Sequence, residues 1–123
     1  MNEHVTHRQS EQDYLESILM LAREKDFVHR IDVAKREGVS QAAVNKAIKL
    51  LVDKGYVYED GKHLYLTKSG ETYATQVYEK HCLVRDFLQK LGVSAAVAEE
   101  DACKLEHLVS EETVSAMKKF LKN

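Results

Sequence analysis

Three residues near the C-terminus combine metal-binding side chains with a spacing that places them on one face of a helix. Cys103, Glu106 and His107 stand at positions i, i+3 and i+4, which share an arc of roughly 100° on an α-helix. A thiolate, a carboxylate and an imidazole that converge in this way form half of a transition-metal site. Cys103 alone would more often be a small core residue, so the prediction rests on the triplet.

Other side chains could complete this site. His81 interrupts an apolar seam in which a leucine would pack better, and a buried imidazole costs free energy unless it finds a partner. If two antiparallel helices carry them, His81 comes to lie beside Cys103. Asp13 and Glu16, at i and i+3, could add oxygen ligands. Glu99 shares the face of Cys103, but we interpret it as a solvated carboxylate.

Helical patterns position these residues. Apolar residues at three- and four-residue spacing predict helices over 10–25, 68–91 and 94–109, and a short last helix follows from 110. The seam of the second helix consists of Val77, His81, Val84, Leu88 and Leu91. Ser10 is the predicted cap of the first helix. In a competing interpretation, Asp13 only closes this cap and Glu16 is solvated.

The first half of the chain has the pattern of a winged helix-turn-helix. Its predicted elements are a helix over 31–37, a turn at 38–40, a helix over 41–54, and strands over 56–59 and 63–66. Gly38 can end the first helix in a left-handed conformation, and Ser40 can cap the second. Asp60-Gly61 is a hairpin signal. Two helices, a tight turn and a hairpin in this order predict the winged fold.

The outer side of the second of these helices suits DNA. Small and amide residues at a helix N-terminus can approach base edges, and lysines can meet phosphates. Lys62 stands at the hairpin tip, where a wing touches the DNA backbone. The candidate DNA-binding residues are Ser40, Gln41, Ala42, Asn45, Lys46, Lys49 and Lys62. The alternative is a three-helix packing module that does not bind DNA.

Composition narrows the class of protein. The 123 residues are 44% hydrophobic and 31% charged, which is typical of a soluble globular protein. No apolar run reaches the roughly 18 residues of a membrane span. No signal peptide or disulfide framework is visible, so we expect a cytoplasmic protein. With a net charge of −2, a nucleic-acid binder must gather its basic residues locally or lower its negative charge with a ligand.

With these residues assembled, the chain resembles the diphtheria-toxin-repressor family of metal-responsive transcription regulators, which includes the manganese transport regulators. The similarity runs from Asp13-Tyr14-Leu15-Glu16 through Leu66-Thr67-Lys68-Ser69-Gly70 and His81 to a stretch at 102–110 that reads A-C-x-L-E-H-x-x-S. This last stretch is quite specific, whereas many families share the helix-turn-helix.

The resemblance implies a mainly α fold with a small β-hairpin wing. Residues 1–67 would form a winged helix-turn-helix DNA-binding domain, and residues 68–123 a helical metal-binding and dimerisation domain. Metal would favour the DNA-competent arrangement of a homodimer, whose operators control metal uptake genes. The implied metal ligands are Asp13, Glu16, His81, Cys103, Glu106 and His107.

Three positions depart from the patterns within the family. Manganese regulators usually have a carboxylate where this chain has Cys103, whereas iron-responsive members usually have that cysteine but a methionine in place of Asp13. Arg85 stands where members often have a glutamate, and it cannot ligate a metal. We therefore expect Mn²⁺ or Fe²⁺ as the cofactor, with Zn²⁺ as an alternative.

Three functions are weighed. The first is a metal-activated, homodimeric repressor that binds a double-stranded DNA operator and has no membrane partner. The second is a metal-independent winged-helix regulator that responds to a small molecule or a thiol signal. The third is a small metalloenzyme, but the chain has no nucleophile motif and no Gly-rich phosphate loop, so we do not expect an enzyme.

Overall fold

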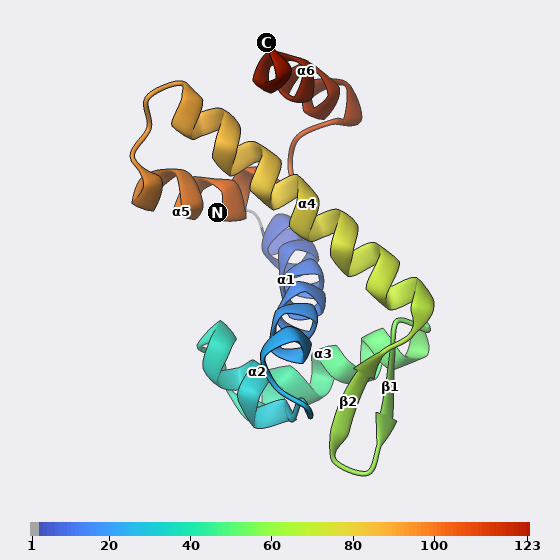
Figure 1. The fold of residues 1–123 in the computed structure, drawn as a ribbon. Helices are drawn as coiled ribbons and strands as arrows, with labels where there is room; N and C mark the ends of the chain where they lie inside the picture. The colour runs from blue at the N-terminus through green and yellow to red at the C-terminus, as the bar shows by residue number, and fades with distance from the viewer. Residues whose placement is uncertain (1–2) are drawn as a thin grey trace. The chain divides into compact units, whose positions relative to one another are not determined.

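The computed structural model describes the backbone of residues 3–123 and the side chains of residues 11–123, and it divides into two compact units, 1–75 and 76–123. The described residues form six helices and one two-stranded sheet (Figure 1). This arrangement confirms the predicted mainly α fold with a small hairpin. The predicted functional boundary between residues 67 and 68 stays a prediction.

The first unit contains three helices, a hairpin and the start of a fourth helix. In order these are α1 (Glu3–Glu24), α2 (Arg30–Glu37), α3 (Gln41–Asp53), β1 (Val57–Asp60), β2 (His63–Leu66) and the first turns of α4 (Lys68–Lys90). The prediction that Ser10 caps α1 is wrong, because the helix already begins at Glu3 and no glycine or proline interrupts it. The side chain of Ser10 lies outside the described residues.

The turn between α2 and α3 follows the local sequence. Gly38 ends α2 with a φ of 69°, a left-handed conformation that costs glycine little. The Ser40 hydroxyl accepts a hydrogen bond from the backbone N–H of Ala43 at 3.1 Å and so caps α3. Val44 and Ile48 are fully buried, whereas Val52 is exposed and not part of the core.

The hairpin pairs β1 and β2 antiparallel, with Val57 opposite Leu66 and Asp60 opposite His63. Gly61 at its tip has a φ of 63°. Val57 and Leu64 are buried, whereas Tyr58 is exposed and stacks on Tyr65 across the strands at 5.1 Å. The alternation of strand side chains thus gives the hairpin one buried face and one exposed aromatic face.

The junction between the hairpin and α4 is tightly built. Thr67 Oγ1 donates to the carbonyl of Gly55 at 2.6 Å and accepts the N–H of Gly70 at 3.0 Å. A Cβ atom on Gly70 would stand 1.9 Å from the carbonyl oxygen of Tyr56. Glycine at this position therefore lets α4 start against the backbone that precedes β1.

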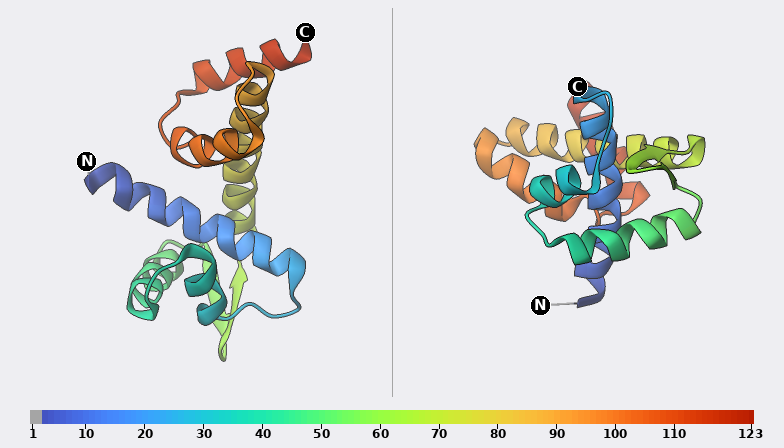
Figure 2. Two further views of the ribbon diagram at one scale, coloured as in Figure 1. Left: turned by 90° about the vertical axis from the view of Figure 1, so that its left-hand side faces the viewer. Right: turned by 90° about the horizontal axis from the view of Figure 1, so that it is seen from below.

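The second unit consists of the rest of α4 with α5 (Ala95–Leu105) and α6 (Glu111–Lys122). The chain reverses at Gly92, whose φ is 108°, and Ser94 and Ser110 cap α5 and α6. Within this unit, α5 runs back beside α4 (Figure 1 and Figure 2). Near the C-terminal end of α4, the ring of Phe87 packs edge to face against the ring of Phe120 of α6, with 5.3 Å between the ring centroids.

We expect Gly70→Ala to destabilise the first unit, because the added methyl group would overlap the Tyr56 carbonyl and force the backbone apart. Overpacking of this kind costs roughly 1–3 kcal/mol. Thermal unfolding followed by circular dichroism measures the loss. Glu71→Ala, one residue further along the same helix and exposed, is the control. Equal midpoints for the two variants would contradict the close contact.

Candidate metal centre and DNA-binding surface

His81 lies in the interior of the second unit with a carboxylate near each ring nitrogen. The residue is 4% exposed. Its Nε2 atom is 2.7 Å from Oε2 of Glu99, and its Nδ1 atom is 3.2 Å from Oε2 of Glu106. The prediction that His81 occupies a buried seam is therefore confirmed. The carboxylates that it meets are Glu99 of α5 and Glu106 at the C-cap of that helix.

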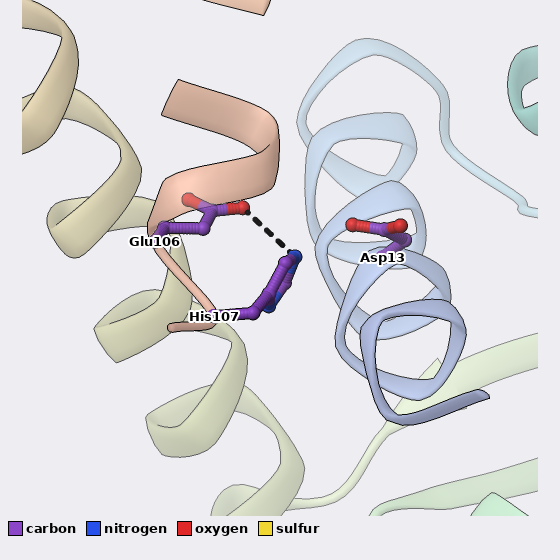
Figure 3. Close-up of side chains that lie close together, drawn as sticks. All are labelled: Asp13, Glu106 and His107. Carbon is purple, nitrogen blue, oxygen red and sulfur yellow. Dashed lines mark ion pairs between the residues drawn. The ribbon is translucent and has the colours of Figure 1, made fainter. Parts of the chain in front are cut away.

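Glu106 and His107 follow α5 instead of lying within it. The predicted helix to residue 109 is wrong, because α5 ends at Leu105 and Glu106 is its C-cap. The carbonyl of Leu105 accepts both Leu108 N–H at 2.9 Å and Val109 N–H at 3.2 Å, which tightens the chain into turns. Figure 3 shows Oε1 of Glu106 facing Nε2 of His107, at 3.4 Å. Both side chains are almost completely buried.

This donor set fits a divalent transition metal. The Nδ1 atom of His81 and the Oε2 atom of Glu106 are buried and have no hydrogen-bond partner among the described residues, although they face each other. The thiol of Cys103 and the carboxylates of Glu106 and Glu99 raise the pKa of His81 to about 11, against the opposite effect of burial. A bound cation would offset the negative charge around His81. It would also give these two buried atoms a partner.

Cys103 is less buried than a core residue would be. It is exposed on α5, yet its thiol interacts with His81 strongly enough to be the largest cause of the raised pKa of that histidine. The interpretation of Cys103 as a small packing residue does not fit this exposure. The ligand assignment stays a prediction.

Asp13 and Glu16 belong to α1 in the first unit and lie on consecutive turns of the helix. Both side chains are half-buried, and Figure 3 labels Asp13 on α1. Burial, Glu37 and Asp13, in that order, raise the pKa of Tyr14. The next residue after Glu16 is Ser17, which is fully buried. The predicted acids therefore stand on a face of α1 that is packed and negatively charged.

Glu99 is the residue that our interpretation of the sequence undervalued. It is half exposed, as a solvated carboxylate would be, but one oxygen is held by the ring of His81. Its position four residues before Cys103 and seven before Glu106 places all three on one stripe of α5 and its extension. That spacing was the available signal.

The predicted DNA-binding side chains are accessible. Gln41, Ala42, Asn45, Lys46 and Lys49 are all exposed on α3, opposite the buried Val44, Ile48 and Leu51. Ser40 is occupied by its cap, and Lys62 is exposed beside Gly61 at the tip of the hairpin. The helix thus presents small, amide and basic side chains on a single outer surface.

Comparisons with known proteins match both halves of the chain. Residues 8–64 match the family model described as iron dependent repressor, N-terminal DNA binding domain, and residues 67–123 match iron dependent repressor, metal binding and dimerisation domain. Transcriptional regulator MntR of Escherichia coli O6:H1 is 41% identical over 109 residues, which are 88% of this chain and 70% of MntR.

The chain belongs to the iron-dependent-repressor family of metal-dependent transcriptional regulators. A solved structure of the manganese regulator SloR is 33% identical over 91% of this chain, with a TM-score of 0.82. A manganese-dependent transcriptional repressor in complex with manganese is 30% identical over the same share, with a TM-score of 0.81. The chain spans about half the length of these two solved proteins.

Membership in this family confirms the predicted resemblance and fold, and it disfavours a metal-independent regulator. Iron-dependent repressors are transcriptional regulators, which are not a class of enzyme. None of the described helices is long and apolar enough to cross a membrane.

His81 should make the stability of the metal-free protein depend on pH. Its pKa is about 11 in the folded protein and about 6.5 in an unfolded chain. Between these values the folded protein holds the extra proton, so the free energy of unfolding falls as pH rises. The contribution is complete below about pH 6.5 and is lost as pH passes through the folded pKa.

Urea unfolding of the chelator-treated protein at several pH values in this window measures that dependence. His81→Gln is the matched variant, since it keeps a polar side chain but has no titrating ring. We expect the parent protein to lose stability with rising pH relative to this variant. Parallel pH profiles would show that His81 carries no such proton.

Proposed function

We propose that this chain is a metal-activated, homodimeric repressor that binds a double-stranded DNA operator and controls genes of metal homeostasis in the cytoplasm. The observation that carries the proposal is the buried pair of His81 Nδ1 and Glu106 Oε2, an imidazole nitrogen and a carboxylate oxygen that face each other without hydrogen bonds. The same chain presents an accessible recognition helix, α3.

In this proposal six residues hold the metal. His81, Cys103, Glu106 and His107 supply nitrogen, sulfur and oxygen donors from the second unit, and Asp13 and Glu16 of α1 add carboxylates. The bound cation supplies positive charge that neutralises this acidic set. Glu106 is central, because its two oxygens face different histidines.

The link to DNA is thermodynamic. A metal can favour DNA binding only if it binds the DNA-competent arrangement more tightly than the alternatives. Ser17, the residue after Glu16, donates to the carboxylate of Glu37 and accepts from Nη1 of Arg36 at 3.0 Å. These two residues end α2, so part-buried side-chain hydrogen bonds tie α1 to the helix-turn-helix. A metal that holds the acids of α1 therefore acts on a helix already joined to the DNA-binding unit.

In the proposed DNA interface, different side chains contribute to general affinity for DNA and to recognition of the base sequence. Lys46, Lys49 and Lys62 are suited to phosphate contacts, whereas Gln41, Ala42 and Asn45 near the start of α3 are suited to base edges. Ser40 holds the N-terminus of that helix in place. A net charge of −2 for the whole chain makes these clustered lysines, together with bound metal, the basis of attraction to DNA.

The donor set favours Mn²⁺ or Fe²⁺. Carboxylates from Asp13, Glu16 and Glu106 suit hard cations such as Mn²⁺, whereas the Cys103 thiolate suits softer ions such as Fe²⁺ or Zn²⁺. Solved structures similar to this chain include a manganese regulator and a manganese-dependent repressor in complex with manganese. Arg85 lies one turn after His81 and brings a positive charge to that side of the helix.

Exposed apolar residues of the second unit support the homodimer in this proposal. None of the α6 residues is buried, and Phe120 is 43% exposed. Leu91 and Leu108 are more than half exposed. Apolar surface of this kind is typical of subunit interfaces.

We expect Glu106→Ala to abolish metal-dependent DNA binding while the helices still fold. The variant removes a carboxylate that faces both His81 and His107. Loss of a residue that only supports a metal ligand already costs up to about 100-fold in metal affinity. Because Glu106 is proposed to bind the metal directly, its loss should raise the metal dissociation constant by about 100-fold or more. Metal affinity and operator affinity are measured together, with Mn²⁺, Fe²⁺ or Zn²⁺ supplied in turn. Glu112→Ala on α6 is the control. Metal-stimulated DNA binding by the Glu106 variant at the parent's level would refute the proposed site.

We expect Lys46→Ala or Lys49→Ala to weaken binding to operator and random DNA alike, because the DNA phosphates are the same at every base pair. Each lost phosphate contact should lower the slope of log K against log salt by about one unit per half-site. Asn45→Ala should instead weaken operator binding more than random binding. Salt titrations by fluorescence anisotropy on both DNAs distinguish the two roles. Equal losses on both DNAs for Asn45→Ala would rule out base reading at that position.

A further inference from the structure

The two nitrogens of His81 have different surroundings. Nε2 lies 2.7 Å from Oε2 of Glu99, a hydrogen-bonding distance. Nδ1 lies 3.2 Å from Oε2 of Glu106, but neither of these two atoms makes a hydrogen bond within residues 11–123. Nε2 is therefore hydrogen-bonded to a carboxylate, whereas Nδ1 lies within ion-pair distance of one without a hydrogen bond.

The two carboxylates differ in burial. Glu99 is 51% exposed, whereas Glu106 is 2% exposed. Glu99 keeps one side in water, which lowers the cost of its charge, and reaches inward to the ring. Glu106 has no such access to water, so a cation on its side of the ring would relieve a larger penalty.

Arg85 reinforces the difference between the two sides of the ring. It stands one turn after His81 on α4, and its guanidinium interacts electrostatically with Glu99. A positive charge near Glu99 opposes a metal cation there. The Nδ1 side, with Glu106 and next to it His107, has acidic and imidazole groups instead.

From this geometry we propose that Glu99 is a positioning residue for the metal site of the proposed function. Its carboxylate accepts the Nε2–H of His81, fixes the ring orientation and tautomer, and leaves Nδ1 as the nitrogen that binds the metal. Histidine ligands in metalloproteins commonly donate their second N–H to a carboxylate, which orients the ring and increases its basicity.

Glu99→Ala and Glu99→Gln test this role in the full chain. Loss of an outer-shell partner costs roughly 10- to 100-fold in metal affinity, so we expect Glu99→Ala to bind Mn²⁺ and Zn²⁺ more weakly by that factor. Glu99→Gln should retain most of the affinity, because the amide oxygen accepts the same N–H. Glu100→Ala, the exposed neighbour on α5, should bind as the parent does. Dissociation constants come from competition with a chelating dye, and circular dichroism verifies folding.

A second measurement reports on the ring itself. Long-range ¹H–¹⁵N correlation spectra of the Zn²⁺-loaded parent should show the metal on Nδ1 of His81 and a proton on Nε2. Zinc on Nε2, or a Glu99→Ala variant that binds metal like the parent, would overturn the proposal. Equal losses in the Ala and Gln variants would make Glu99 a direct ligand and also overturn it. A parent that binds neither Mn²⁺ nor Zn²⁺ would instead refute the proposed function.

Discussion

A buried imidazole with a carboxylate at each nitrogen is the interaction on which the second unit depends. His81 is placed by the seam of α4, and neither of its partners comes from that helix. The reversal at Gly92 and the cap at Ser94 start α5 so that Glu99 and Glu106 reach the ring from its two sides. Replacing His81 with an apolar residue would leave Oε2 of Glu106 buried without the imidazole that faces it, a costly arrangement for a charge. The groups that pair α4 with α5 and its C-cap are thus also suited to bind a metal.

In the first unit, a set of polar contacts around the buried Ser17 joins α1 to the end of α2. Ser17 of α1 is fully buried and joins the two residues that end α2, Arg36 and Glu37. Burial is the main cause that raises the pKa of Glu37, against its contact with Ser17. Because Glu16 directly precedes Ser17, the residues proposed to sense metal and those that fix the helix-turn-helix share one turn of α1. A change at that turn can reach α2 without passing through the hairpin.

Charge connects the two parts of the proposed function. Lysines exposed on α3 and at the hairpin tip lie in a chain whose net charge is negative. Acids concentrated among the candidate ligands account for part of that excess. A divalent cation bound to them would reduce the repulsion between the protein and DNA phosphates, in addition to any effect on geometry. Both contributions have the same sign, so metal and operator binding would support each other.

The sequence by itself determined the order of the elements, the cap at Ser40, the exposed side of α3 and the stripe that carries Cys103 and Glu106. These are local properties, set by periodicity and by side chains that bond to their own backbone. Only the tertiary structure decided that α5 stops at Leu105, that Glu99 is bound to His81 and that Nδ1 is the nitrogen without a hydrogen bond. Those outcomes depend on which groups from separate helices meet in a buried space, where an unsatisfied polar atom is costly. Spacing along one helix can place Glu99 on the stripe of Cys103, but it does not say which group of another helix the side chain meets.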